Sequence, residues 1–221
     1  LAAIEQIGRI RRTATSTALR RHATATLDRV ALDQGLLPEQ LDDIAAPRVG
    51  LDGPGIAYRG VEYAIDLADG PELVLRRPDG TRTRSLPPAR TDTDAAVVAE
   101  WRARRAAARV PIRDQVRRLE EEMITQRRWS AEDVATLAGH PLLGRLAGRL
   151  IWLVDGRTAV IGDRGDLVDV DGNRLPILEE VLLAHPATAD LAGWRAWRDD
   201  RSIVQPFPQI DRDVHDGDPS S

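Results

Sequence analysis

The chain has 221 residues, of which 42% are hydrophobic and 30% charged, with a formal net charge of -4 at pH 7. This supplies enough apolar material for one large or two small domains, and the negative net charge excludes a general polyanion-binding role for the whole chain. The sequence has no cysteine, which excludes disulfide bonds and thiolate metal sites.

No apolar run approaches the roughly 20 residues that a membrane helix requires. There is also no charged and apolar leader with a cleavage site, so we expect a cytoplasmic protein without membrane partners. The chain begins at Leu1 rather than at a methionine, and we expect it to be part of a longer protein.

Residues 1–45 are predicted to form an N-terminal helical segment. Apolar residues at helical spacing in 1–33 indicate one long helix or two shorter ones, and Pro38 suits the first turn of a short third helix. The segment "APRVGLDGPG" at 46–55 is rich in glycine and proline and predicts a loop. It marks the start of an α+β domain at 46–213, which is followed by a disordered acidic tail at 214–221.

Two short β blocks are predicted on either side of a helical middle. The first, at 56–85, has Asp-Gly corners at 69–70 and 79–80, which are typical of an antiparallel meander. A helix then runs from "TDTD" to about Val110, where Pro111 either interrupts it or opens the next helix, and Ser130 with Asp133 forms a capping box for a further one. The second block, at 150–175, again turns at Asp-Gly. The predicted fold class is α+β, with N-terminal helices and two small antiparallel β meanders flanking a helical middle.

The segment "DVDGNR" at 169–174 resembles the middle of a calcium-binding EF-hand loop. When Gly172 is placed at position six of that loop, Leu167 and Leu178 fall at positions one and twelve, where the ion needs carboxylates. Asp166 and Glu179 each miss these positions by one residue. We therefore predict a hairpin corner, with no metal and no cofactor.

Catalytic candidates are few. A hydrolase would pair His140 or His185 with Asp163, Asp169 or Asp190 and with a serine such as Ser130, but the chain has neither a Gly-x-Ser-x-Gly nor a His-Glu-x-x-His motif. Both histidines precede a proline and are extended there, so hydrogen bonding to the neighbouring backbone is the favoured interpretation. The enzyme alternative has a pocket between the two β blocks that gathers His140, His185, Trp152 and Gln205.

The densest positive charge lies at 102–118, where seven arginines accompany a single acidic residue, Asp114. Arg102, Arg105 and Arg109 can share a helix face and contact phosphates. The preferred alternative is a solvated helical face whose arginines pair with Glu120 to Glu122 or with an acidic neighbouring domain.

Several segments taken together resemble a bacterial family called domain of unknown function 4132. They are "RLEEEMITQRRW", "HPLLGRLAGRLIW", "VLLAHP", the pair Trp194 and Trp197, and "SIVQPFPQIDR", preceded by "GLLPEQLDD", "GLDGPG" and "SLPPAR". The resemblance covers roughly residues 35 to 213, and the family has no established catalytic residues to assign to this chain. Members often form the C-terminal part of larger proteins, some with a WGR module and helical repeats, and one is described as a regulator of molybdate metabolism. This chain has no WGR module.

We accordingly expect a non-catalytic interaction or regulatory module that forms the C-terminal part of a larger bacterial protein. Its expected partners are upstream helical repeats or other domains of the same protein, and nucleic acid is the less favoured partner. The residues expected to make these contacts are Arg102, Arg105, Arg109, Trp152, Trp194 and Phe207, the last as a plug in the core or in a domain seam.

Overall fold

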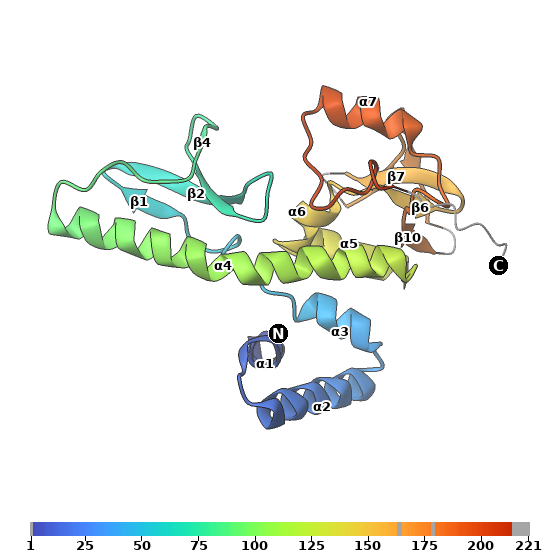
Figure 1. Cartoon of the computed structure of the whole chain (residues 1–221), viewed down its shortest axis with the longest axis horizontal. Coiled ribbons are helices and arrows are strands. Elements are labelled where there is room, and N and C mark those ends of the chain that lie inside the picture. Colours follow the sequence, from blue (N-terminus) through green and yellow to red (C-terminus); the bar gives the residue numbers. More distant parts are fainter. Residues whose placement is uncertain (1, 163–164, 178–179, 214–221) are drawn as a thin grey trace. The chain divides into compact units, whose positions relative to one another are not determined.

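A computed structural model describes residues 2–162, 165–177 and 180–213. Its helices and antiparallel sheets confirm the α+β class (Figure 1). The chain divides into two compact units, Leu1–Gln115 with Gly139–Gly144, and Val116–Ala138 with Arg145–Ser221. The predicted bounds of the family domain, 46–213, stay a prediction.

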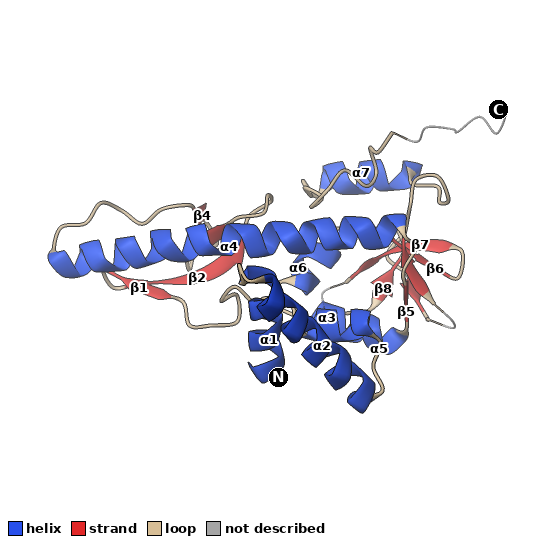
Figure 2. Cartoon of the chain, turned by 60° about the horizontal axis from the view of Figure 1, so that its bottom comes forward, coloured by secondary structure: helices blue, strands red, loops and turns tan. Residues whose placement is uncertain are grey.

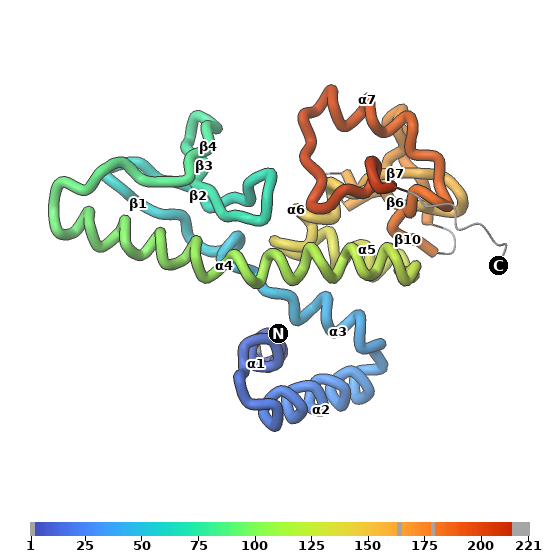
Figure 3. Tube along the Cα trace, viewed as in Figure 1, coloured from blue at the N-terminus to red at the C-terminus, as the bar shows by residue number. Residues whose placement is uncertain are grey.

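Three helices begin the first unit: α1 (Ala2–Thr13), α2 (Thr17–Gln34) and α3 (Pro38–Ile44). The tube in Figure 3 traces them in succession. Region 1–33 is therefore two helices, because Ser16 caps α2 by accepting a hydrogen bond from the Leu19 amide. Leu27, Ala31 and Leu41 form their small apolar core.

The first sheet contains β1 (Ile56–Tyr58), β2 (Val61–Leu67), β3 (Leu73–Arg76) and β4 (Arg82–Thr83) in that order. Every neighbouring pair is antiparallel, which confirms the predicted meander. The sheet lies beside the first half of a long helix, α4 (Asp92–Ile124), as Figures 1 and 2 show. Trp101 of that helix is buried and donates a hydrogen bond from its indole nitrogen to the Arg84 carbonyl, which fixes the sheet to the helix.

Helix α4 runs without a break from Asp92 to Ile124 and contributes to both units. The prediction that Pro111 interrupts the helix or opens a new one was wrong. Proline removes only the bond from its own position to the Ala107 carbonyl. The buried side chains of Trp101, Ile112 and Leu119 lie on both sides of it and hold the helix in place.

The second unit is built on a sheet of six short strands in the order β5-β10-β6-β7-β8-β9, all antiparallel. The strands are β5 (Arg128–Trp129), β6 (Trp152–Val154), β7 (Arg157–Ile161), β8 (Leu167–Val168), β9 (Arg174–Leu175) and β10 (Val181–Leu183). Helix α7 (Ala192–Asp200) belongs to this unit, and α5 (Ala131–Gly139) and α6 (Leu143–Ala147) precede its main strands. Ile151, Val160, Ala184, Trp194 and Ile210 are among its buried core residues.

Two local predictions in this unit are confirmed. The Ser130 amide donates to the Asp133 carboxylate and the Asp133 amide donates to the Ser130 hydroxyl, as in a capping box. Asp155 and Gly156, with φ of 47° and 78°, form the two-residue corner between β6 and β7. The predicted acidic tail at 214–221 lies outside the described residues. Among the described helices, none is both long and apolar enough to cross a membrane.

Candidate functional site

His140 is buried, and both of its ring nitrogens meet the backbone. Nδ1 accepts hydrogen bonds from the amides of Leu142 (3.2 Å) and Leu143 (3.1 Å), and Nε2 lies 3.2 Å from the Ala46 carbonyl oxygen. Because Nδ1 is the acceptor, the network assigns the proton to Nε2, which donates to Ala46. The ring therefore fastens the 46–53 loop to the start of the α6 segment.

His185 is partly buried, and its Nδ1 accepts a hydrogen bond from the Ala187 amide at 3.2 Å. Burial, followed by the positive charge of Arg212, lowers the pKa of this imidazole. His140 belongs to the first unit and His185 to the second, and neither lines the groove or the corner described below. Of the carboxylates predicted as partners, Asp163 lies outside the described residues.

The loop that carries "GLDGPG" is held by arginines from both sides. Arg48 donates to Glu5 of α1 (2.7 Å) and to Asp52 (2.8 Å), which raises the pKa of Arg48 and lowers that of Asp52. Arg104 of α4 donates to the Gly50 carbonyl at 3.2 Å. Gly50 has a φ of 76°, which favours glycine, and a Cβ there would lie 2.1 Å from the Arg104 Nη2 atom and would displace the end of that side chain.

Beside this loop lies a groove with a volume of about 640 Å³, here named the α1–α4 groove. Its apolar lining comes from the loop and from the middle of α4: Pro47, Val49, Ala107, Val110 and Pro111. Its polar lining comes mainly from α1: Glu5, Gln6, Arg9, Arg12, Thr13, Arg48 and Asp114. Val110 is 60% exposed and presents an apolar side chain in this lining.

Val49 has a φ of 47°, in the left-handed region that β-branched residues avoid. Such a conformation costs about 1–3 kcal/mol and persists only where the surroundings impose it. The ion pairs of Arg48 and the contact of Arg104 with Gly50 impose it here. They hold an apolar side chain in the lining of the groove.

The arginine-rich face of α4 is partly neutralised within the first unit. Arg105 and Arg109 donate to the two oxygens of Glu72 at 2.9 and 2.8 Å, and these bonds lower the pKa of Glu72. Arg102 is exposed. Of the three arginines predicted to contact phosphates, two are thus paired with a carboxylate of the neighbouring turn.

The aromatic residues predicted for interactions lie in the core of the second unit. Trp152 and Trp194 are 0% and 1% exposed, and their indole nitrogens donate to the Ala147 carbonyl and to the Thr158 hydroxyl. Phe207 is also buried. All three stabilise the unit and contribute little to its exposed surface.

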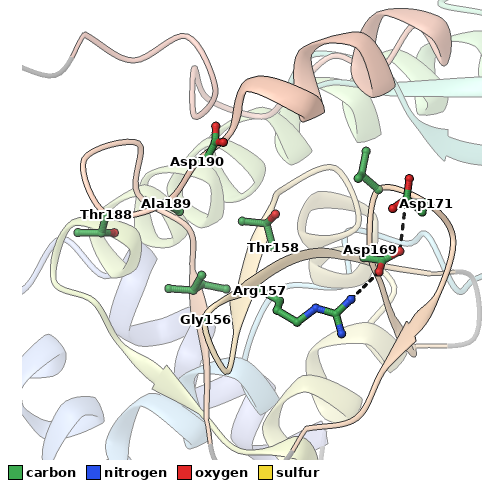
Figure 4. A pocket seen from close by; sticks show the side chains of 10 residues that line it. Gly156, Arg157, Thr158, Asp169, Asp171, Thr188, Ala189 and Asp190 are labelled. Atoms are coloured by element: carbon green, nitrogen blue, oxygen red, sulfur yellow. Dashed lines mark hydrogen bonds and ion pairs between the residues drawn. The ribbon is translucent and has the colours of Figure 1, made fainter.

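The 169–173 corner is shown in Figure 4, next to an open pocket of about 460 Å³. The Asp169 carboxylate accepts hydrogen bonds from the amides of Asp171 and Asn173 and from the Arg157 guanidinium, and the Asn173 amide bond is the main cause that lowers its pKa. Gly172, with a φ of 89°, completes the turn.

These bonds occupy the oxygens that a cation would need, and the second acidic candidate, Asp166, pairs with Arg174 at 2.8 Å. The predicted hairpin corner is confirmed between β8 and β9. Leu178 and Glu179 lie outside the described residues. Within the described part of the chain, no group of three or more His, Asp or Glu residues is placed to hold a metal ion.

One buried side chain was not recognised from the sequence. Gln209 is 0% exposed; its Oε1 accepts from the Ile151 amide, and its Nε2 donates to the carbonyls of Ile151 and Ala184, each at 2.8 Å. Gln205 donates to Gln209 and accepts from the Ile210 amide. The "QPFPQ" motif thus acts as a clamp that hydrogen-bonds the backbone at Ile151 and Ala184. The only hint of this role in the sequence is the pair of glutamines on either side of Pro-Phe-Pro.

A family model described as "Domain of unknown function (DUF4132)" matches residues 80–220. The chain belongs to this family. The "Uncharacterized protein YehI" of Escherichia coli (strain K12) is 28% identical over 231 aligned residues, which cover 95% of this chain and 19% of that protein. The chain therefore spans about a fifth of the length of this curated relative. No solved structure matches this chain.

Proposed function

We propose that this DUF4132 chain is a non-catalytic interaction module of a larger bacterial protein, and that the α1–α4 groove is its docking surface. The observation that carries the proposal is the groove itself, where an exposed Val110 and a strained Val49 line an apolar hollow among charged residues. Concave apolar surfaces with a few polar groups are the usual places where proteins bind partners and ligands.

The proposed partner is a helical segment from the rest of the same polypeptide. About four fifths of the curated relative lies outside the region that this chain matches, so a longer family protein offers many intramolecular partners. A cytoplasmic location and a regulatory role belong to this proposal as expectations from the sequence, and the links to WGR modules and molybdate metabolism as expectations from the family resemblance.

The two alternatives have less support from the contacts. The enzyme alternative relies on His140 and His185, but the His140 ring has the backbone as partner at both nitrogens. The nucleic-acid alternative relies on Arg102, Arg105 and Arg109, and two of these bind Glu72. A protein partner for the groove requires neither set of residues.

The test is hydrogen exchange on the isolated chain and on the full-length polypeptide in which we propose it is embedded. If the groove is covered, amides in segments 5–13 and 107–114 should exchange at least about tenfold more slowly in the longer protein. Strand β2 (Val61–Leu67) serves as the internal control and should exchange equally in both. Equal exchange at the groove in the two proteins would overturn the proposal.

A further inference from the structure

The walls of the α1–α4 groove have the spacing of helix faces. On α4 the lining residues Ala107, Val110, Pro111 and Asp114 follow the i, i+3, i+4, i+7 pattern of one face. On α1 the lining residues Glu5, Gln6, Arg9, Arg12 and Thr13 follow a similar pattern. Seven residues of helix span roughly 10 Å, so each wall is about two turns long. A groove between two such helix faces is suited to a third helix laid along it.

The charges of the two walls differ in sign. Glu5 and Arg48 are paired with each other at 2.7 Å, so their charges offset one another. Arg9 on α1 and Asp114 on α4 have no hydrogen-bond or ion-pair partner for their charged groups among the described residues. The groove therefore presents the positive charge of Arg9 on the α1 wall and the negative charge of Asp114 on the α4 wall.

The α4 wall also includes a proline, Pro111. Because Pro111 has no amide hydrogen, the Ala107 carbonyl lacks the i+4 hydrogen bond that it would otherwise accept within the helix. Ala107 and Pro111 both line the groove. A side chain that donates hydrogen bonds, such as lysine, is therefore favoured on the α4 side over one that only accepts them.

We infer that the partner is an amphipathic helix with an aliphatic face, an acidic flank toward Arg9 and a basic flank toward Asp114. This inference rests on the proposed docking function and adds the chemistry of the partner. The aliphatic face packs on Val49, Val110 and Pro111. The basic flank pairs with Asp114 and donates to the Ala107 carbonyl.

The experiment uses a fluorescent amphipathic peptide of about 18 residues, long enough to span the two-turn walls. It carries leucine and alanine on one face, glutamate on one flank and lysine on the other, and its control is a peptide of the same composition in scrambled order. Fluorescence anisotropy with the whole chain should show binding of the first peptide and at least about tenfold weaker binding of the scrambled one.

Charge variants test the polarity of the groove. Arg9→Asp and Asp114→Arg should each weaken binding about tenfold, because each replaces a surface attraction by a repulsion of similar size. The double variant should recover most of the affinity, because the helix can bind in the opposite direction and exchange its flanks. Arg102→Asp, at an exposed α4 position outside the groove lining, should leave binding unchanged and serves as the control.

Val49→Gly tests the apolar floor, because glycine accepts the positive φ and preserves the loop while the aliphatic contact is lost. Circular dichroism should match that of the unmodified chain while peptide affinity falls. Equal binding of the scrambled peptide, or losses that simply add in the double charge variant, would overturn the inference. If hydrogen exchange at the groove is slower in the full-length polypeptide, these peptide results refute only the proposed amphipathic character of the partner. If hydrogen exchange there is not slower, the proposed docking function fails as well.

Discussion

Replacement of Gln209 by alanine tests whether the "QPFPQ" clamp holds the second unit together. The substitution removes the acceptor of the Ile151 amide and a donor to the Ala184 carbonyl, and both residues are 0% exposed. The Ile151 carbonyl keeps a second bond, from the Ala184 amide at 3.0 Å. Two buried backbone groups are thus left without partners at about 1–3 kcal/mol each, so the free energy of unfolding should fall by about 4 kcal/mol.

Urea unfolding followed by tryptophan emission measures this loss. Four of the five tryptophans, all except Trp101, lie in the second unit, so the signal reports mainly on that unit. Gln205→Ala is the matched control; this side chain is only partly buried and water can replace its bonds, so about 1 kcal/mol is expected. A loss below about 1 kcal/mol for Gln209→Ala would refute the reasoning, because buried amide and carbonyl groups without partners cost more than that.

Gln209→Glu distinguishes a hydrogen-bond clamp from simple packing. Glutamate has nearly the same shape, but its carboxylate would face the carbonyls of Ile151 and Ala184 with no hydrogen to donate. Burial and these oxygens should raise the pKa of the glutamate in the folded state. Stability is then greatest below the unfolded pKa of about 4.3 and is lost as pH rises through the folded pKa. If packing alone mattered, this variant would be as stable as the original at neutral pH.

Gly50→Ala should cost about 2 kcal/mol in urea unfolding, about 1 for a side chain at positive φ and about 1 for the hydrogen bond from Arg104 to the Gly50 carbonyl, which the new Cβ displaces. Gly60→Ala, with a similar φ of 75° and nothing within 4 Å of the new Cβ, should cost only about 1 kcal/mol. Equal losses at the two glycines would contradict the role given to Arg104. Val49→Gly should change the free energy of unfolding by less than about 1 kcal/mol, since relief of strain offsets the added chain entropy. Because the pKa of His185 is lowered in the folded state, its contribution is complete above the ordinary value of 6.5 and falls as the pH drops through it. His185→Asn keeps an acceptor for the Ala187 amide and should therefore show a smaller drop in Tm between about pH 7.5 and about pH 5, and an equal drop would contradict this.

The features that could be predicted from the sequence depend on neighbours along the chain. The Asp155-Gly156 corner needs only two residues that tolerate positive φ, and the Ser130–Asp133 box needs only residues three apart. The same holds for the 169–173 corner, where Asp169 bonds the amides of Asp171 and Asn173. Counting positions was sufficient for each of these.

The features that could not be predicted depend on partners far along the chain. His140 meets a carbonyl 94 residues away, and Gln209 meets an amide 58 residues away, so neither role leaves a local pattern. At Pro111 the local rule was outweighed by tertiary packing, because a helix with buried residues on both sides tolerates one missing hydrogen bond. The groove combines three segments, 5–13, 47–49 and 107–114, whose proximity exists only in the fold.

Several polar side chains in the structure satisfy backbone groups. His140, Gln209 and Arg104 each bind a carbonyl or amide group of a segment far away in the sequence. A side chain that holds a segment in place loses these hydrogen bonds when it moves, so it is poorly suited to catalysis and well suited to keeping a surface rigid. Rigid surfaces bind with a smaller loss of conformational entropy. The strained Val49, held by such contacts in the groove lining, is where this rigidity would be used. Arg104 does not line the groove, so Arg104→Ala tests its contact with Gly50 apart from the groove surface. Weaker binding of the amphipathic peptide would show that this contact serves docking, and unchanged affinity would show that it serves stability alone.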